Sequence, residues 1–220
     1  MEEPNQHNEA TLANAEHRFL TSEQMKVARK EGRTVSGLGI VFEKESVMMM
    51  TEEGRLFYEV IHPEAVARAV ENPSIWVDYN HKPAQLLGTQ YAGTARFSVT
   101  DEGVMYDVDV PDTTYANDML ALVDRGDIRG SSFVFIAARN GDKWTPEKRD
   151  GLNIYRRDIT QIARIISMGP VFGEAYPDTT VAKRSLLEWE AEEARKATSE
   201  PPAPPAPTGL SPEALRLIIG

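Results

Sequence analysis

Apolar and polar positions alternate along several short stretches of the chain, which is the pattern of β-strands that bury one face. In the first of these stretches Val35, Gly37, Gly39 and Val41 occupy alternate positions after Arg33. Glycines inside a strand are typical of a bulge or a tight bend, as found where a sheet curls. We therefore expect a curved strand at this point of the chain.

Similar patterns recur at regular spacing further along the chain. They predict strands at Gly93–Val99 and Val104–Val110, and the short turn-like segment between them predicts a hairpin. Further strands are expected at Ser74–Val77, Ser132–Ile136 and Ile159–Ile166. Many short strands at such spacing are typical of an antiparallel sheet or barrel.

Two segments have a helical pattern instead. Pro63–Val70 begins with proline, which is tolerated at the first helical position. Thr113–Arg125 is followed by Gly126, a residue type that commonly ends helices. The expected fold is therefore α+β and mainly β, with an antiparallel sheet curled or closed into a barrel and flanked by helices.

Composition divides the chain into five segments. We expect a polar N-terminal arm (residues 1–32), a folded domain (33–185), a charged helix (186–199), a proline-rich linker (200–210) and a short C-terminal helix or tail (211–220). The arm has too little apolar content for a core element, although Thr21 or Ser22 would cap a short helix within it. The linker favours an extended chain that cannot join a core. The last segment is either a docking peptide or a tail without a role.

Charge and residue usage exclude several kinds of site. The formal net charge of −10 argues against a nucleic-acid binder that works by neutralising phosphates. The absence of cysteine excludes disulfides, thiolate metal sites and cysteine catalysis. The four histidines do not stand at metal-motif spacing, so we assign no metal and expect no cofactor. We expect neither a signal peptide at the N-terminus nor an apolar stretch long enough to span a membrane.

One histidine and one serine stand at the ends of strand-like runs. His81 follows the run Ser74–Val77, and Ser132 opens a run after the glycine-bounded segment Gly126–Gly130. A hydroxyl is a poor nucleophile until a neighbouring imidazole takes its proton, and such pairs are defined by geometry rather than chain order. Spacing alone leaves two interpretations open: a catalytic pair, or a histidine and a serine with structural roles.

Five motifs in a fixed order link the chain to a known family. They are an opening glycine-containing strand, an F-x-E-x-I-x-P segment, an N-H segment followed by L-G, a G-x-h-x-G-h-S-F-x-F segment in which h is apolar, and a P-A-Y-P-x-T segment. They match Arg33–Phe42, Phe57–Val66, Asn80–Gly88, Gly126–Phe135 and Ala175–Thr179. The stretch resembles the prohead protease family of tailed bacteriophages, which are serine peptidases that mature procapsids and are distantly similar to herpesvirus assemblin. The resemblance implies an assemblin-like barrel.

The resemblance also implies roles for individual residues. Ser132 stands where the family's serine precedes Phe-x-Phe, so it is the expected nucleophile, and His81 is the expected general base. Adjacent residues on a strand face opposite sides, so Ser131 is interpreted as a structural hydroxyl. His62 matches a variable position of the family and is expected to be structural.

The third member of the expected triad departs from the family pattern. The family has an acid in an E-V-S or D-V-S tripeptide before its P-A-Y-P segment, and this chain has Ser167 at that place. A hydroxyl stabilises an imidazolium less well than a carboxylate does. Ser167 is the expected third member, and Asp78 and Glu174 are the alternative acids. A slow or inactive enzyme is the third explanation.

The function expected from the resemblance is that of a serine endopeptidase. Its substrates would be capsid and scaffold proteins and the protease itself, and its location would be the assembling procapsid in the host cytoplasm. Two other functions stay open: a catalytically weak or inactive assembly module that binds scaffold or capsid protein, and a general cytoplasmic hydrolase. We expect no nucleic-acid or membrane partner and leave open whether the chain forms homo-oligomers.

Overall fold

The computed structural model of the 220-residue chain describes residues 15–20, 26–51, 53–172 and 180–199. The chain divides into two compact units, Met1–Leu186 and Leu187–Gly220. Some features predicted from the sequence lie outside the described residues: the cap at Thr21 or Ser22, the alternative acid Glu174, the motif Ala175–Thr179, the linker 200–210 and the tail 211–220.

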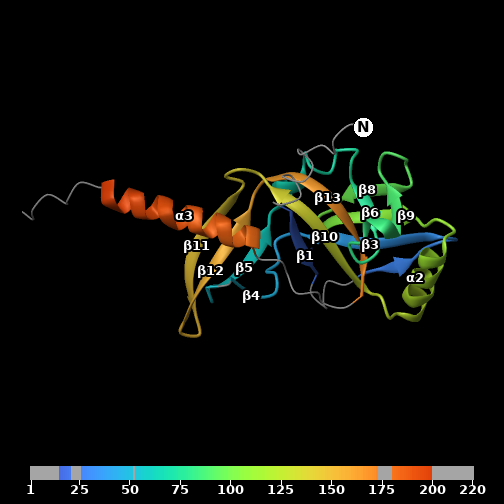
Figure 1. Cartoon of the computed structure of the whole chain (residues 1–220), viewed down its shortest axis with the longest axis horizontal. Coiled ribbons are helices and arrows are strands. Elements are labelled where there is room, and N and C mark those ends of the chain that lie inside the picture. The colour runs from blue at the N-terminus through green and yellow to red at the C-terminus, as the bar shows by residue number, and fades with distance from the viewer. Residues whose placement is uncertain (1–14, 21–25, 52, 173–179, 200–220) are drawn as a thin grey trace, which may run out of the picture. The chain divides into compact units, whose positions relative to one another are not determined.

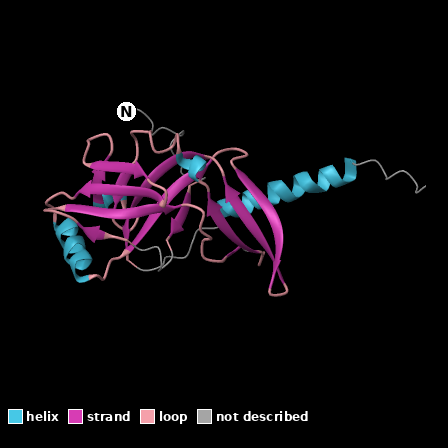
Figure 2. Cartoon of the chain, turned by 180° about the vertical axis from the view of Figure 1, so that it is seen from behind, coloured by secondary structure: helices cyan, strands magenta, loops and turns pink. Residues whose placement is uncertain are grey.

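The strands of the first unit form three sheets (Figures 1 and 2). They are β1 (Glu16–Phe19), β2 (Ala28–Arg29), β3 (Thr34–Val41), β4 (Met49–Met50), β5 (Leu56–Ile61), β6 (Trp76–Asp78), β7 (Leu86–Thr89), β8 (Ala95–Val99), β9 (Gly103–Asp109), β10 (Gly130–Ala137), β11 (Asp142–Arg149), β12 (Leu152–Ile159) and β13 (Ile162–Val171). The sheet orders are β1-β10-β13-β6-β7, β11-β12-β5-β4 and β2-β3-β9-β8. The mainly β, α+β class is confirmed. Within the described residues none of these sheets closes on itself, so the structure does not show the expected barrel.

The helices agree with the sequence patterns in part. The α2 helix (Thr114–Arg125) ends at Gly126, whose φ of 79° and N–H bonds to the carbonyls of Leu122 and Val123 terminate it as predicted. The segment expected at Pro63–Val70 forms only a short 3-10 helix, η2 (Pro63–Val66). A second 3-10 helix, η3, spans Pro83–Gln85.

The α3 helix (Thr180–Ser199) includes residues 186–199, where the sequence predicts a charged helix. No helix in the described part of the chain is long and apolar enough to cross a membrane.

The strand pairing agrees with the predicted hairpin but not with the strand predicted at Ile159–Ile166. The hairpin is confirmed, because β8 and β9 pair antiparallel. The single strand expected at Ile159–Ile166 is wrong, because Ile159 ends β12 and Ile162 begins β13. Thr160 and Gln161 donate their N–H groups to the Gly141 carbonyl, at 2.8 and 2.9 Å, instead of joining a ladder. This turn separates two strands that belong to different sheets.

The hydrophobic core joins the five-stranded sheet to the sheet of β3 and β9. Phe133 and Phe135 on β10 belong to the same buried cluster as Ile40 and Tyr106. The register between β3 and β9 shifts around Gly39, which confirms the irregularity that the glycines predict. A side chain at Gly37 would overlap the Tyr106 hydroxyl within the same sheet, and a side chain at Gly39 would overlap Met168 on β13 of the five-stranded sheet. Gly39 therefore allows the two sheets to approach closely.

The strand β1 is an edge strand contributed by the N-terminal arm. It pairs antiparallel with β10, with Phe19 opposite Ser132 and Arg18 opposite Phe133. Although the arm is polar, Glu16 and Arg18 are buried, at 0% and 5% exposure. Their burial is tolerated because each is paired with charges from distant strands, described below.

Candidate active site

The structure brings His81 and Ser132 together. The distance between His81 Nε2 and Ser132 Oγ is 2.5 Å, and the serine is fully buried on β10. His81 follows β6, which is separated from β10 by β13 in the sheet. The two residues therefore meet across one intervening strand.

A left-handed turn carries the histidine back over the sheet. Asn80 and His81 have φ values of 56° and 53°, a conformation that few residues other than glycine adopt without support. Support comes from β13 and the residue after it: the Asn80 N–H donates to the Pro170 carbonyl at 3.1 Å, and the Phe172 N–H donates to Asn80 Oδ1 at 2.8 Å. This turn fixes the direction from which the imidazole reaches β10.

Gly169 makes room for this crossing. It lies on β13 directly opposite Ser132, and a side chain there would overlap the Asp78 carbonyl oxygen. The missing Cβ therefore lets the end of β6 lie close to β13.

We predict that Gly169→Ala lowers kcat on a capsid or scaffold substrate by about 100-fold, because displacing the Asp78–His81 turn misaligns the imidazole. Steady-state kinetics and a melting curve would test this. An unchanged kcat in the folded variant would contradict it.

The neighbouring serine faces the other side of the strand. The Ser131 and Tyr106 hydroxyls are 3.0 Å apart, and both residues are completely buried. Ser132, by contrast, contacts the imidazole. The two hydroxyls therefore alternate as predicted, and Ser132 is the one that lies beside His81.

The second nitrogen of His81 faces Asp78. His81 Nδ1 and Asp78 Oδ1 are 3.7 Å apart, both are buried, and neither has a hydrogen-bond partner in the structure. The other carboxylate oxygen of Asp78 accepts a hydrogen bond from Trp76 Nε1 at 2.8 Å. Ser167 is buried on β13 opposite Val134, and it makes no hydrogen bond to Nδ1. Within the described residues, Asp78 is therefore the candidate acid that lies against the ring.

Burial sets the protonation of both groups. Burial, together with the nearby His17, lowers the pKa of His81 to about 4. Burial raises the pKa of Asp78, against the opposing effect of its hydrogen bonds to Trp76 and to the His81 main chain. A neutral imidazole near neutral pH is the form that accepts a proton from a serine.

We predict that His17→Ala raises the pKa of His81, because the substitution removes an opposing charge and part of the burial. In the unsubstituted chain His81 stays neutral as the pH falls from 6.5 toward 4, whereas an unfolded histidine is protonated in that window. This difference lowers the stability of the fold as the pH falls through the window.

A pH titration of the His81 imidazole by NMR would measure the shift, with His62→Ala as the control. His62 is held elsewhere by Glu43 and Asp158, at 2.8 and 2.7 Å. A His81 pKa of 6.5 in the unsubstituted chain, or an equal effect of both substitutions, would contradict the prediction.

His62 has the structural role expected from the sequence. Burial acts to lower its pKa, but the hydrogen bonds to Asp158 and Glu43 outweigh burial and raise the pKa. Both ring nitrogens of His62 therefore contact carboxylates. No group of three or more histidine or acidic side chains in the described ranges is arranged to hold a metal ion.

Sequence reasoning missed a buried network of charges beside the candidate pair. Arg18 and Arg157 each bond both Glu16 and Glu59, and Arg157 Nε also donates to Asp142 at 2.6 Å. Burial opposes the ionisation of Glu59, but Arg18 and Arg157 hold its pKa at about 2. The one signal in the sequence was Glu59, the glutamate of the F-x-E-x-I-x-P motif.

A comparison with protein families agrees with the motifs. The family model described as caudovirus prohead serine protease matches residues 21–192. The match covers more than half of the chain and confirms the resemblance predicted from the sequence. Neither the curated proteins nor the solved structures gave a match.

Proposed function

Because the chain belongs to the caudovirus prohead serine protease family, we propose that it is a serine endopeptidase of procapsid maturation with Ser132 as nucleophile and His81 as base. The observation that carries this proposal is the 2.5 Å contact between His81 Nε2 and Ser132 Oγ. The neutral state of the buried imidazole supports it further.

The reaction follows from the two side chains. Ser132 Oγ attacks the carbonyl carbon of the substrate peptide bond while its proton passes to His81 Nε2. The C–N bond then breaks, and His81 gives the proton to the departing amine, which leaves an ester on Ser132. Water, deprotonated by His81, hydrolyses this ester and restores the serine.

Asp78 is proposed as the third member in place of Ser167. When His81 takes the serine proton, its Nδ1–H becomes part of a cation, and a carboxylate stabilises that cation. Asp78 Oδ1 needs to move by about 1 Å to come within hydrogen-bond distance of Nδ1, from the present 3.7 Å. Ser167 stays the alternative third member, and a comparison of Asp78 and Ser167 variants distinguishes the two.

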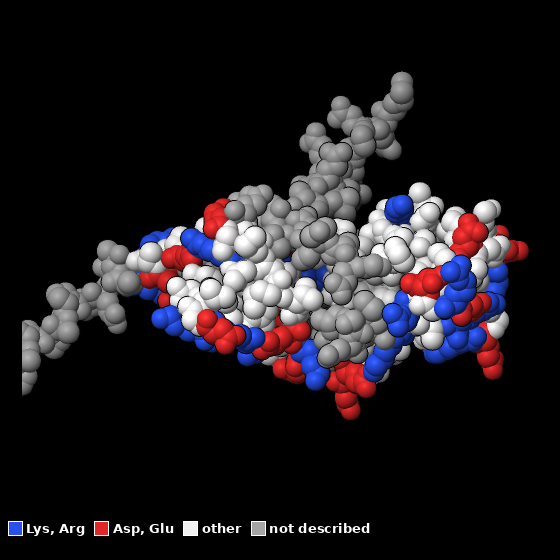
Figure 3. Space-filling view, turned by 90° about the horizontal axis from the view of Figure 1, so that it is seen from below, with Lys and Arg blue, Asp and Glu red and all other residues white. Residues whose placement is uncertain are grey.

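The proposed substrates are capsid and scaffold proteins inside the assembling procapsid, together with the chain itself. Acidic and basic side chains are interspersed over the described part of the face in Figure 3, and the net charge is −10. Such a surface favours protein partners over polyanions.

The proposal is tested by expressing the chain together with the capsid and scaffold proteins of its phage and measuring the masses of the products. We expect truncated capsid or scaffold proteins with the unsubstituted chain and full-length proteins with Ser132→Ala. The same truncations with both chains would overturn the proposal. Normal particles with uncut proteins in both cases would identify a non-catalytic assembly module instead.

A further inference from the structure

We infer that β1 occupies the binding place of a substrate strand, and that the enzyme cuts after arginine in segments of the form Glu-x-Arg. This inference rests on the proposed function, because it assigns a substrate class to the Ser132–His81 pair. It concerns β1, which precedes residues 21–192 of the family match.

The position of β1 is that of a peptide presented to the nucleophile. It adds a strand to the free edge of β10, as peptides do when they bind by strand addition. Ser132 Oγ donates a hydrogen bond to the Arg18 carbonyl at 2.7 Å. The rings of His17 and Phe19 lie 5.0 and 5.9 Å from the His81 ring. The Arg18–Phe19 peptide bond therefore lies beside the catalytic pair.

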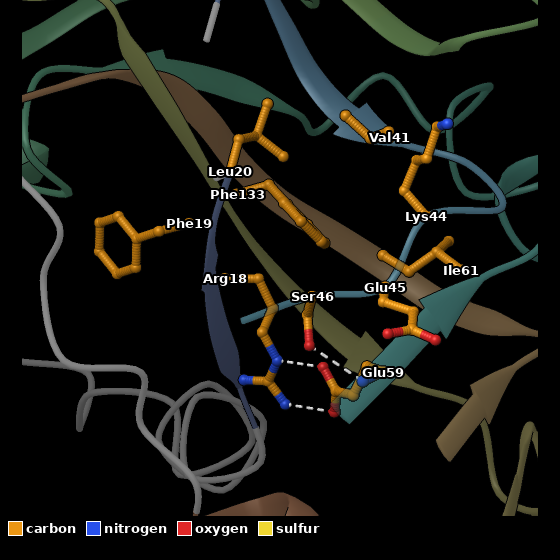
Figure 4. A pocket seen from close by; sticks show the side chains of 10 residues that line it. All are labelled: Arg18, Phe19, Leu20, Val41, Lys44, Glu45, Ser46, Glu59, Ile61 and Phe133. Atoms are coloured by element: carbon orange, nitrogen blue, oxygen red, sulfur yellow. Dashed lines mark hydrogen bonds and ion pairs between the residues drawn. The ribbon is translucent and has the colours of Figure 1, made fainter. Parts of the chain in front are cut away.

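The side chain of Arg18 is buried on the opposite face of the sheet. Its guanidinium forms a two-bond contact with the Glu59 carboxylate, one bond measuring 2.7 Å (Figure 4). The guanidinium also lies 5.6 Å from the centre of the Phe135 ring. Arg18 and Glu59 line a pocket there together with Ser46 and Phe133. A planar fork that bonds both oxygens of one carboxylate distinguishes arginine from lysine.

Glu16, two positions before Arg18, pairs with a cation in the same way that Arg18 pairs with a carboxylate. Glu16 points to the same face as Arg18 and accepts bonds from Arg157 Nη1 and Nη2 at 2.6 and 3.0 Å. Without β1, the groups that stay are Glu59, Arg157 and the partly buried Asp142. Among these three groups, two carboxylates and one guanidinium leave one negative charge without a counterion, and Arg157 Nη2 lacks the Glu16 oxygen that it bonds. The place of β1 therefore offers a negative charge to a cation and a guanidinium N–H to an anion. Because buried charges require partners, a strand that replaces β1 is selected for Glu and Arg at these positions.

In this structure β1 also blocks the Ser132–His81 pair. The single hydroxyl proton of Ser132 is directed to the Arg18 carbonyl oxygen, whereas attack requires that proton to go to His81. A substrate strand reaches the edge of β10 only after β1 has left it. We therefore expect β1 to compete with substrates.

A quenched peptide with the sequence of residues 15–20, Ala-Glu-His-Arg-Phe-Leu, tests the substrate class. The full-length enzyme should cut it after arginine with kcat/KM at least about 100-fold higher than for the peptide with alanine in place of arginine. Replacing its glutamate by alanine, or its arginine by lysine, should also lower kcat/KM. Equal rates for the arginine and alanine peptides would overturn the inference.

The competition is tested with Arg18→Ala in the full-length chain. This change leaves Glu16 and Glu59 facing each other without Arg18 between them, which favours release of β1. We expect about tenfold faster cutting of the arginine peptide, because more molecules have a free β10 edge. The control is Arg125→Ala, since the Arg125 side chain is 71% exposed and pairs with Asp127. Equal rates for the two variants would overturn the competition.

Failure of this inference can be distinguished from failure of the proposed function. Ser132-dependent cutting of capsid or scaffold protein at sites without arginine would sink the inference and leave the proposed function intact. If Ser132→Ala changes neither protein nor peptide cleavage, the inference and the proposed function are both overturned.

Discussion

Ser132→Ala should lower kcat/KM for capsid or scaffold cleavage by at least about 10⁴-fold, whereas Ser131→Ala should keep most of the activity. The two hydroxyls differ by one position and face opposite sides of β10. Only Ser132 lies within hydrogen-bond distance of the imidazole, while Ser131 bonds the buried Tyr106 hydroxyl.

The comparison of the two variants separates chemistry from stability. Ser131→Ala removes a buried hydrogen bond and should lower the free energy of unfolding by about 1 kcal/mol. Ser132→Ala should leave the protein folded and inactive. Product masses measure the cleavage activity of both variants, and melting temperatures measure their stability. A large loss of activity from Ser131→Ala alone would assign the nucleophile to the other hydroxyl.

The elements of the candidate pair were predictable because local patterns place them. The strand containing Ser132 follows from the short apolar run Phe133–Ile136, and the helix before it ends at a glycine as predicted. A two-residue period also shows that only one of the two serines can face His81, and the family motif indicates Ser132. The family motifs then select His81 from four histidines.

The role of β1 was not predictable, because the burial of its charges depends on partners far away in the chain. Arg18 meets Glu59 across 41 residues, and Glu16 meets Arg157 across 141 residues. The arm is mostly polar and has no clear apolar period, and such a composition is typical of a surface segment. The motif glutamate Glu59 signals a site without indicating its partners.

The sequence left the third member open among Ser167, Asp78 and Glu174 and did not show which of them lies against the ring. Counting along the motif leads to Ser167, but the ring orientation of His81 depends on the left-handed turn at Asn80 and His81. That turn brings the acid three residues before the histidine against Nδ1. A motif count assumes the usual backbone path, so it does not detect an acid that comes from another part of the chain.

Asp78→Asn is therefore expected to lower kcat by about 10³- to 10⁴-fold, whereas Ser167→Ala should change it by only a few-fold. The amide occupies the same space as the carboxylate and can keep the contact with Trp76 Nε1, so the turn should hold its shape. What it loses is the negative charge that stabilises the His81 cation in the transition state. KM should change little, because Asp78 is buried behind the imidazole, at 2% exposure.

Single-turnover rates of acylation on a capsid or scaffold substrate measure this effect, and Ser167→Asp completes the comparison. If Asp78 is the third member, Ser167→Asp adds a second carboxylate without raising the rate. If Ser167 orients the ring instead, Ser167→Asp raises the rate, Ser167→Ala carries the large loss, and Asp78→Asn stays close to the unsubstituted enzyme. The chemistry needs a group at Nδ1 that favours the charged ring, and these three variants identify which side chain supplies it.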